Sequence, residues 1–400
     1  MNNKAIYYSF WRLVCVLIGC ACTPKNNRIY FTINEPCDKL VFPVRLNDSV
    51  TANLMFDTGG NFVLDSAFFT NNVDVADYAP AIIIPNGGGS AWSHHHDNTY
   101  LYTKIPKTKI GDIPLEYEEL QVFNYKRYFN SETDGIFNIP QNDTIHTWEL
   151  NFEHNYLEIH SSSDFTLPES CFILPMTRTN KEIYIQLPLH MDYLCDTITT
   201  NNMYVIDTGM LWDVVLMCQA DTDHIFFQNK EKDAVWIRDG NGYYKYNTVN
   251  AVMFNTFTID SLRIYTFDNN RNIGCGRLIG LNFLKHFNVF FDLKNRKLGL
   301  LPIKNFQRVV NPTRRRFHYI SPASKDGKHI ITKIANNKEN FFYTAGLREG
   351  DEITAINGML SKDLIREQIF ESDTLLYDVV RNGQPIQIMV LVDKSIEQGD

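Results

Sequence analysis

An acidic tripeptide that occurs twice, each time after an apolar run, is the feature that most constrains how this chain can fold. Residues 54–61 read LMFDTGGN and residues 204–211 read YVIDTGML, which places Asp57 and Asp207 directly after apolar residues. Burying a carboxylate at the end of a strand costs free energy unless the group is paired or hydrogen-bonded. Two such acids in one chain therefore predict that they meet and satisfy each other.

The two tripeptides are part of a longer internal repeat. The segment DGIFNIP (134–140) follows the first tripeptide, and RLIGLNF (277–283) follows the second. Farther on, ELNFEHNYLEI (149–159) matches FDLKNRKLGL (291–300). Landmarks that recur in the same order at nearly one offset indicate a duplicated structural unit.

Each unit has the composition of an all-β fold. Short runs rich in Val, Ile, Tyr and Phe alternate with turn residues, which is typical of strands. The expected strands include 40–46, 81–84, 115–122, 243–252 and 257–264. Helical candidates are short, such as 281–286 after Gly280. We therefore predict an all-β chain whose two halves form barrel-like or sandwich-like lobes.

The tripeptides can carry hydrolytic chemistry if the two lobes pack about an approximate two-fold axis. Asp57 and Asp207 would then lie at the seam, where like charges cannot both ionise, and the pair would hold one proton. One carboxylate could act as a general base on water while the other polarises a carbonyl group. Glycines would allow sharp turns after the acids, and threonine hydroxyls would brace these turns. The residues expected to do so are Thr58, Gly59, Thr208 and Gly209.

The repeated pattern of two apolar residues before Asp-Thr-Gly, with an apolar pair downstream, resembles the pepsin and retropepsin-like aspartic protease family. The likeness covers residues 28–304 and is strongest at VIDTG and LIGLNFL. It implies a bilobal β fold with a long cleft, an N-terminal lobe over 28–165 and a C-terminal lobe over 166–304. It also implies that Asp57 and Asp207 are catalytic and that the two threonines interlock beneath them.

Three positions depart from the family pattern. Gly60 and Met210 stand where the family usually has Ala, Ser or Thr, and neither can donate a hydroxyl to the outer carboxylate oxygen. This difference predicts higher pKa values for the two acids. Asn138 stands where the second copy of the repeat has Gly280, and we expect the first-lobe loop to be distorted there.

The family covers its cleft with a hairpin flap from the first lobe, which the resemblance places at residues 82–102. The flap residues expected to give mobility or to cover the acids are Gly87, Gly88, Gly89, Trp92 and Tyr100. An alternative is that the two aromatic residues simply pack. The same segment contains His94-His95-His96, but only two of these share a face in an extended chain, and two ligands rarely suffice for a metal. We therefore expect an exposed polar loop, with no metal and no cofactor.

The residues after Pro302 read as a smaller module over 308–395. TAGLREGDEITAING (344–358) resembles the signature of PDZ domains. These domains are small β-sandwiches with two helices that bind peptides by adding a strand. The resemblance implies tight turns at Gly346 and Gly350. A helix over 362–370 and a hairpin around 381–384 are expected to follow. Docking on the protease lobes is the alternative to peptide capture.

The N-terminus reads as an export signal over 1–20. Lys4 and Arg12 flank the short apolar run 13–18, and Gly19-Cys20 follows. The run is too short for a membrane span. Leu17-Ile18-Gly19-Cys20 resembles a bacterial lipobox, which implies lipidation of Cys20, a tether over 21–27 and attachment to the cell envelope, either periplasmic or at the outer membrane. An ordinary cleaved signal is the alternative.

Composition narrows the partners further. The net charge of −8 argues against a nucleic-acid partner, because phosphate binding requires a basic surface. The cysteines outside the signal are scattered, so either disulfides or free thiols fit the sequence. Together the patterns predict an aspartic endopeptidase acting on peptides or proteins. A peptide-binding lipoprotein that has lost catalysis is the main alternative, and glycoside hydrolysis by the acid pair is a weaker one.

Overall fold

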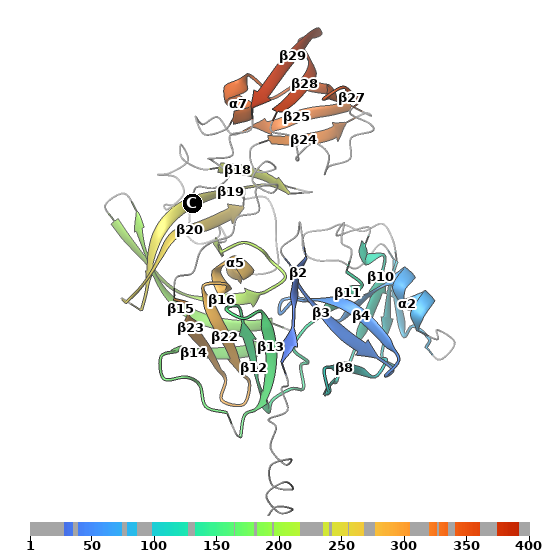
Figure 1. Ribbon diagram of the computed structural model, residues 1–400, viewed down its shortest axis with the longest axis vertical. Coiled ribbons are helices and arrows are strands. Elements are labelled where there is room, and N and C mark those ends of the chain that lie inside the picture. The colour runs from blue at the N-terminus through green and yellow to red at the C-terminus, as the bar shows by residue number, and fades with distance from the viewer. Residues whose placement is uncertain are drawn as a thin grey trace, which may run out of the picture.

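The protein is almost entirely β, in the two large sheets and one smaller sheet of Figure 1. The computed structural model describes residues 28–34, 39–73, 78–85, 98–126, 133–163, 165–179, 182–193, 196–216, 235–239, 242–254, 256–267, 277–304, 320–325, 328–334, 341–360 and 374–391. Over these residues the helices are short, and none is long and apolar enough to cross a membrane. The all-β class predicted from the sequence is confirmed.

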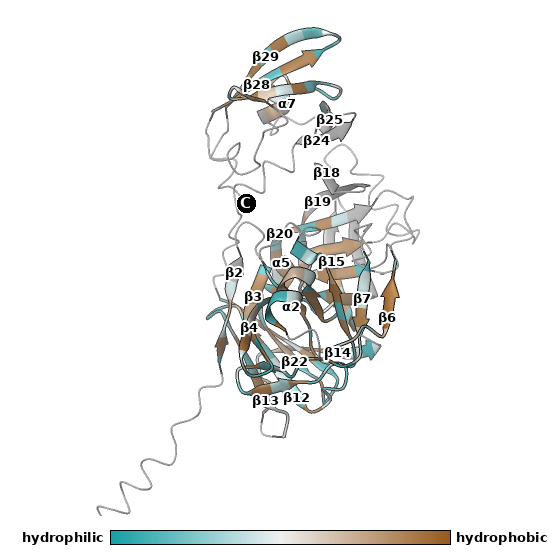
Figure 2. Ribbon diagram, turned by 90° about the vertical axis from the view of Figure 1, so that its right-hand side faces the viewer, coloured by the Kyte–Doolittle hydropathy of each residue, from teal (hydrophilic) through white to brown (hydrophobic). Residues whose placement is uncertain are grey.

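The first lobe is built on a sheet of ten strands in the order β6-β7-β10-β5-β11-β4-β3-β8-β9, with β2 paired to β3. Its strands are β2 (Thr32–Asn34), β3 (Lys39–Leu46), β4 (Val50–Phe56), β5 (Val63–Asp65), β6 (Ile82–Ile84), β7 (Thr99–Tyr102), β8 (Thr108–Ile110), β9 (Ile113–Leu115), β10 (Leu120–Phe123) and β11 (Gly135–Phe137). The helix α2 (Ser66–Asn72) begins after Asp65, whose carboxylate accepts hydrogen bonds from two amides of the first turn. The three isoleucines of the edge strand β6 are exposed and form the hydrophobic strip visible in Figure 2.

The second lobe belongs to a sheet of thirteen strands in the order β1-β13-β12-β22-β23-β14-β15-β16-β21-β17-β20-β19-β18. These strands are β1 (Ile29–Tyr30), β12 (His146–Asn151), β13 (Tyr156–Ser161), β14 (Phe172–Thr179), β15 (Glu182–Tyr193), β16 (Asp196–Asp207), β17 (Val214–Leu216), β18 (Val235–Asp239), β19 (Gly242–Met253), β20 (Phe257–Phe267), β21 (Arg277–Gly280), β22 (Phe287–Asp292) and β23 (Lys297–Pro302). The short helix α5 (Leu281–Leu284) follows β21, where the sequence predicted a helix.

Both lobes contain the same four-strand arrangement around the tripeptide. In the first lobe β4 pairs in parallel with β11, β11 pairs in antiparallel with β5, and β5 pairs in parallel with β10. In the second lobe β16, β21, β17 and β20 are joined by the same succession of parallel, antiparallel and parallel pairings. The repeat in the sequence is therefore a repeat of the fold, and each tripeptide occupies the same place in it.

Hairpins from both repeats join in one sheet between the lobes. β12 pairs with β13, β22 pairs with β23, and the two hairpins meet where β12 pairs with β22. Asn155 and Arg296 turn these hairpins in the left-handed region, at φ 55° and 52°. Trp148 of β12 is buried and stacks on Phe56, the residue before Asp57, with ring centroids 6.0 Å apart. The shared sheet thereby supports the strand that carries the first acid.

One expected strand is divided. Residues 115–122 form the end of β9 and the start of β10, with an irregular segment between them. In that segment Tyr117 stacks on Phe62 with ring centroids 4.3 Å apart and donates a hydrogen bond to the Asn138 carbonyl at 2.6 Å. These tertiary contacts outweigh the local preference for a continuous strand.

The C-terminal unit has its own six-stranded sheet, in the order β24-β25-β26-β28-β29 with β27 paired to β26, and its own core. Its elements are β24 (Ile320–Lys325), β25 (Lys328–Ile334), α7 (Phe341–Ala345), β26 (Glu352–Ile356), β27 (Met359–Leu360), β28 (Thr374–Arg381) and β29 (Gln384–Leu391). Gly346 and Gly350 adopt φ 111° and 89°, as the expected tight turns require. Asp351 is fully buried and binds Arg381 through both carboxylate oxygens, at 2.6 and 2.7 Å. The edge strand β18 of the second lobe lies against β24 and β25 (Figure 1).

Several expectations fall outside the described residues. They concern Cys20 and the N-terminal signal and tether, the flap residues Gly87, Gly88, Gly89 and Trp92, the histidines 94–96, and the helix over 362–370. Among the cysteines, the structure describes Cys171, which is a free thiol whose pKa is raised by burial to about 11. The disulfide question for the other cysteines stays open.

Candidate active site

Asp57 and Asp207 lie at the ends of two equivalent strands, β4 and β16. The three residues before each acid are buried, whereas the acids themselves are half-buried. The Asp57 amide donates a hydrogen bond to the Phe137 carbonyl of β11 at 2.9 Å, and Asp207 is paired with Gly280 of β21. These pairings fix the point at which each carboxylate leaves the apolar interior of its lobe.

Four hydrogen bonds between Thr58 and Thr208 loops lock the two lobes together. The Thr58 amide donates to the Thr208 hydroxyl at 3.0 Å, and the Thr208 amide donates to the Thr58 hydroxyl at 3.1 Å. The Thr58 hydroxyl donates to the Ile206 carbonyl at 2.7 Å, and the Thr208 hydroxyl donates to the Phe56 carbonyl at 3.0 Å. All four bonds cross from one lobe to the other, and both threonines are buried. The interlock therefore fixes the two acids relative to each other.

The two carboxyl groups lie close enough to interact, and the glycines of the tripeptides pack against them. A Cβ atom on Gly59 would lie 2.9 Å from the Asp207 Cγ, and one on Gly209 would overlap the carboxyl group of Asp57. Neither glycine has a positive φ. The expected reason for glycine was a sharp turn; the observed reason is the close approach of the opposite acid.

The electrostatics of the pair are those of two acids that share a proton. Asp57 Oδ1 accepts a hydrogen bond from the Gly59 amide, and Asp207 Oδ1 accepts one from the Met210 amide, both at 2.9 Å. Burial raises the pKa of Asp207 well above its usual value, and the charge of Asp57 raises it further. A proton is therefore retained at a pH at which an isolated aspartic acid would have lost it.

Gly60 and Met210 supply no side-chain donor to the acids, as the sequence predicted. A Cβ atom on Gly60 would lie 2.8 Å from Asp57 Oδ2, so the carboxylate fills the space that a larger side chain would need. The Met210 side chain packs against a small apolar cluster that includes Val205 and Tyr265. Both positions are therefore occupied in ways that leave the outer carboxylate oxygens without a hydroxyl partner from these two residues.

Asn138 maintains the first-lobe loop through a different donor. In the second lobe the Leu281 amide donates to the Met210 carbonyl at 2.6 Å. In the first lobe the Asn138 side-chain amide donates to the Gly60 carbonyl, also at 2.6 Å, and Asn138 is buried. The first-lobe loop therefore keeps a hydrogen bond to the residue after the tripeptide, but a side chain provides it in place of the backbone amide that does so in the second lobe.

The two ends of the expected flap, β6 and β7, pair with each other. β6 and β7 are antiparallel, with Ile83 opposite Tyr100. Tyr100 is half-buried and packs against the main core. This position favours the packing interpretation of Tyr100 over a role in covering the acids.

Lys39 is a residue of the site that sequence patterns missed. It begins β3 in the first lobe, and its ammonium group donates a hydrogen bond to the Gly209 carbonyl of the second lobe. Its charge acts to lower the pKa of Asp207. In the sequence it is simply a lysine at the start of an apolar strand, so nothing local distinguishes it from a solvent-exposed lysine.

We expect Gly209→Ala to damage the site without unfolding the protein. The added methyl group must displace the Asp57 carboxyl group, and a misplacement of about 1 Å can lower a rate about 100-fold. Peptide turnover and the thermal unfolding midpoint would be measured together. Gly299→Ala is the matched control, because its methyl group would meet Leu167 and Phe290 rather than the acids. Turnover unchanged in Gly209→Ala would contradict this reading of the contact.

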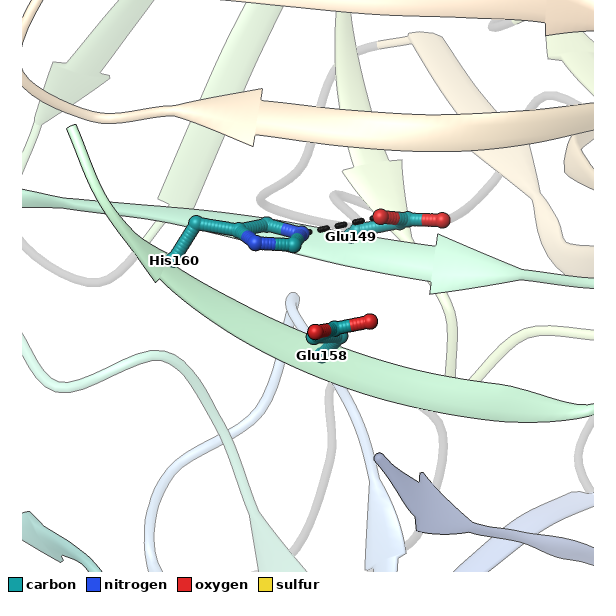
Figure 3. A group of neighbouring side chains, drawn as sticks. All are labelled: Glu149, Glu158 and His160. Atoms are coloured by element: carbon teal, nitrogen blue, oxygen red, sulfur yellow. Dashed lines mark hydrogen bonds and ion pairs between the residues drawn. The ribbon is translucent and has the colours of Figure 1, made fainter. Parts of the chain in front are cut away.

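A second group of titratable side chains lies on the shared sheet, and Figure 3 shows its members, Glu149, Glu158 and His160. Their ligand atoms lie within 4.8 Å of one another. Glu149 already binds His160 at 2.9 Å and the Tyr156 hydroxyl at 2.8 Å, and Glu158 binds Arg28 at 3.1 Å. A cation would have to displace these partners, so the group fits a structural network better than a metal site.

Comparisons with known proteins find matches among solved structures. No protein-family model matches the chain, and no curated protein matches it. Among solved structures, the aspartic proteinase from Irpex lacteus matches with 14% sequence identity and a TM-score of 0.43, over 69% of this chain and 97% of that chain. The chain is similar to that proteinase at this level, and the function proposed below depends on the geometry of the two acids.

Proposed function

We propose that this chain is an aspartic endopeptidase in which Asp57 and Asp207 activate water to hydrolyse peptide bonds. The observation that supports this proposal is the close pair of carboxyl groups at the seam of two equivalent lobes, with the pKa of Asp207 raised by burial and by Asp57. A purely structural duplication has no need for two half-buried acids in contact. Their mutual repulsion costs free energy, but in a catalytic pair the same repulsion keeps one proton on the two acids and so provides both an acid and a base.

The chemistry follows from the single shared proton. The ionised carboxylate accepts a proton from water as the water oxygen bonds to the peptide carbonyl carbon, while the protonated carboxyl group donates its proton to the carbonyl oxygen. The tetrahedral intermediate then collapses, the C–N bond breaks, and a proton passes to the departing nitrogen. No covalent bond to the enzyme forms, and the dyad returns to its singly protonated state.

The purified protein should cleave an unbiased peptide library and be inhibited by pepstatin. We expect turnover to fall as the pH rises through the raised pKa of Asp207, because above it both acids are ionised and none can donate a proton. The measurement is product formation by mass spectrometry from about pH 3 to about pH 9. Turnover that increases steadily toward high pH would contradict the shared-proton mechanism.

The alternative function is peptide binding without turnover. It is favoured by Gly60 and Met210, which provide no hydroxyl to the outer carboxylate oxygens. Peptides retained by the protein with no product at any pH would support this alternative and exclude the protease.

For the remainder of the chain we propose roles that follow the sequence resemblances. The C-terminal unit would be a PDZ-type domain that binds a peptide or partner by strand addition. Leu347, Ile353 and Ile356 of the signature segment are buried in its core, which supports this proposal. The N-terminal segment would attach the protein to the bacterial cell envelope through lipid on Cys20. Labelling with a lipid precursor, lost in Cys20→Ser, would test the attachment.

A further inference from the structure

Lys39 reaches across the seam between the lobes. Its ammonium group hydrogen-bonds the carbonyl of Gly209, 170 residues away in the chain. Gly209 is the residue that packs against the Asp57 carboxyl group, and it belongs to the same loop as Asp207. Lys39 is half-buried, so its charge is less screened than that of a surface lysine.

We infer that Lys39 is a positioning residue of the proposed catalytic pair. Its ammonium group holds the Gly209 loop and favours a negative charge on Asp207. This inference rests on the proposed function of the site.

The need for such a cation follows from the positions after the tripeptides. Gly60 has no side chain, and the Met210 side chain packs into an apolar cluster. Neither residue can stabilise an ionised carboxylate by a hydroxyl hydrogen bond. A nearby ammonium group provides the same kind of stabilisation through its charge, and it acts at longer range than a hydrogen bond.

The two charges that act on Asp207 both come from the first lobe. Among the described residues, Asp57 raises its pKa and Lys39 lowers it, while the Met210 amide lowers it through a hydrogen bond. Burial is the largest influence and raises the pKa, so the net shift is upward. Removing Lys39 would therefore move the titration of Asp207 to higher pH.

The test compares wild type with Lys39→Met and Lys39→Arg. We expect the alkaline limb of the pH profile of kcat/KM, which Asp207 sets, to move up by about 1 pH unit in Lys39→Met. The limb should stay in place in Lys39→Arg, which keeps the charge. Lys109→Met is the control for loss of a lysine elsewhere in the lobe, because Lys109 pairs with Asp48 on the surface. A merely structural role for Lys39 would lower the rate at all pH values without moving the limbs.

A second measurement separates this inference from the proposed function. The carboxyl carbons of the aspartates are labelled with carbon-13 and titrated by NMR without substrate, in wild type and in Lys39→Met. If wild type is inactive but Asp207 titrates at higher pH in Lys39→Met, the protease proposal fails and the role of Lys39 stands. If Asp207 titrates identically in the two proteins, the role of Lys39 is overturned whether or not the wild type is active.

Discussion

Replacing either Asp57 or Asp207 by asparagine is expected to lower peptide turnover about 1,000-fold or more, because each carboxyl group takes part in a proton transfer worth about 100- to 10,000-fold. The two acids act as one unit, so the double variant should be little worse than either single variant. Asparagine has nearly the size of aspartate, and the loops around it should stay folded. The measurement is kcat/KM with a peptide identified from the library.

The control for this prediction is Asp48→Asn, which makes the same chemical change at an exposed site paired with Lys109. It should leave turnover unchanged. A wild-type rate in Asp57→Asn or Asp207→Asn would show that the pair does no chemistry.

The variant Asp207→Asn should also change how the stability of the protein depends on pH. A group whose pKa is raised in the folded state stabilises the fold at low pH, and this contribution is lost as the pH rises through the folded pKa. Asp207 is such a group. The difference in unfolding temperature between Asp207→Asn and wild type should therefore favour the variant more at a pH above the raised pKa than at acid pH. The reason is that asparagine carries no charge that must be desolvated.

Replacing Thr208 by valine is expected to destabilise the protein by about 2–6 kcal/mol. The valine side chain has nearly the same shape, but it leaves the Thr58 amide without its acceptor and the Phe56 carbonyl without its donor. Each buried polar group left unpaired costs about 1–3 kcal/mol. Turnover should also fall, because the bonds that hold the two acids in register come from this pair of threonines.

Thr208→Ser is the matched control, because serine keeps the hydroxyl and loses only a methyl group. The free energy of unfolding in urea would be measured for wild type and both variants, with turnover measured on the same samples. Equal stability of the valine and serine variants would contradict the assignment of the interlock to these hydrogen bonds.

Much of the fold could be predicted from the sequence because its signals are local. The alternation of apolar and turn residues gave the strands β3, β19 and β20 nearly to their ends. The pair Asn382-Gly383 gave the hairpin between β28 and β29, and both residues have the positive φ of such a turn. The acid pair could also be predicted, since two copies of one motif in a duplicated unit are related by the symmetry of the duplication.

Other features depended on contacts that no local pattern encodes. The single strand expected over 115–122 is divided because Tyr117 finds partners in Phe62 and Asn138. In the sequence Asn138 was only a departure from the repeat, whereas in the structure its side-chain amide donates a hydrogen bond to the Gly60 carbonyl. The hairpins β12–β13 and β22–β23, one from each repeat, join in a shared sheet because their edges meet only after the lobes have packed.

The sequence by itself determined the two acids, the repeat that relates them and the all-β lobes that carry them, because apolar periodicity and motif spacing act over a few residues. Only the tertiary structure decided why the glycines must be glycine, which groups the threonines bind and that Lys39 binds the Gly209 carbonyl. These contacts join atoms about 150 to 170 residues apart in the chain. Their energies depend on distance and burial after packing, which adjacent residues in the sequence do not specify.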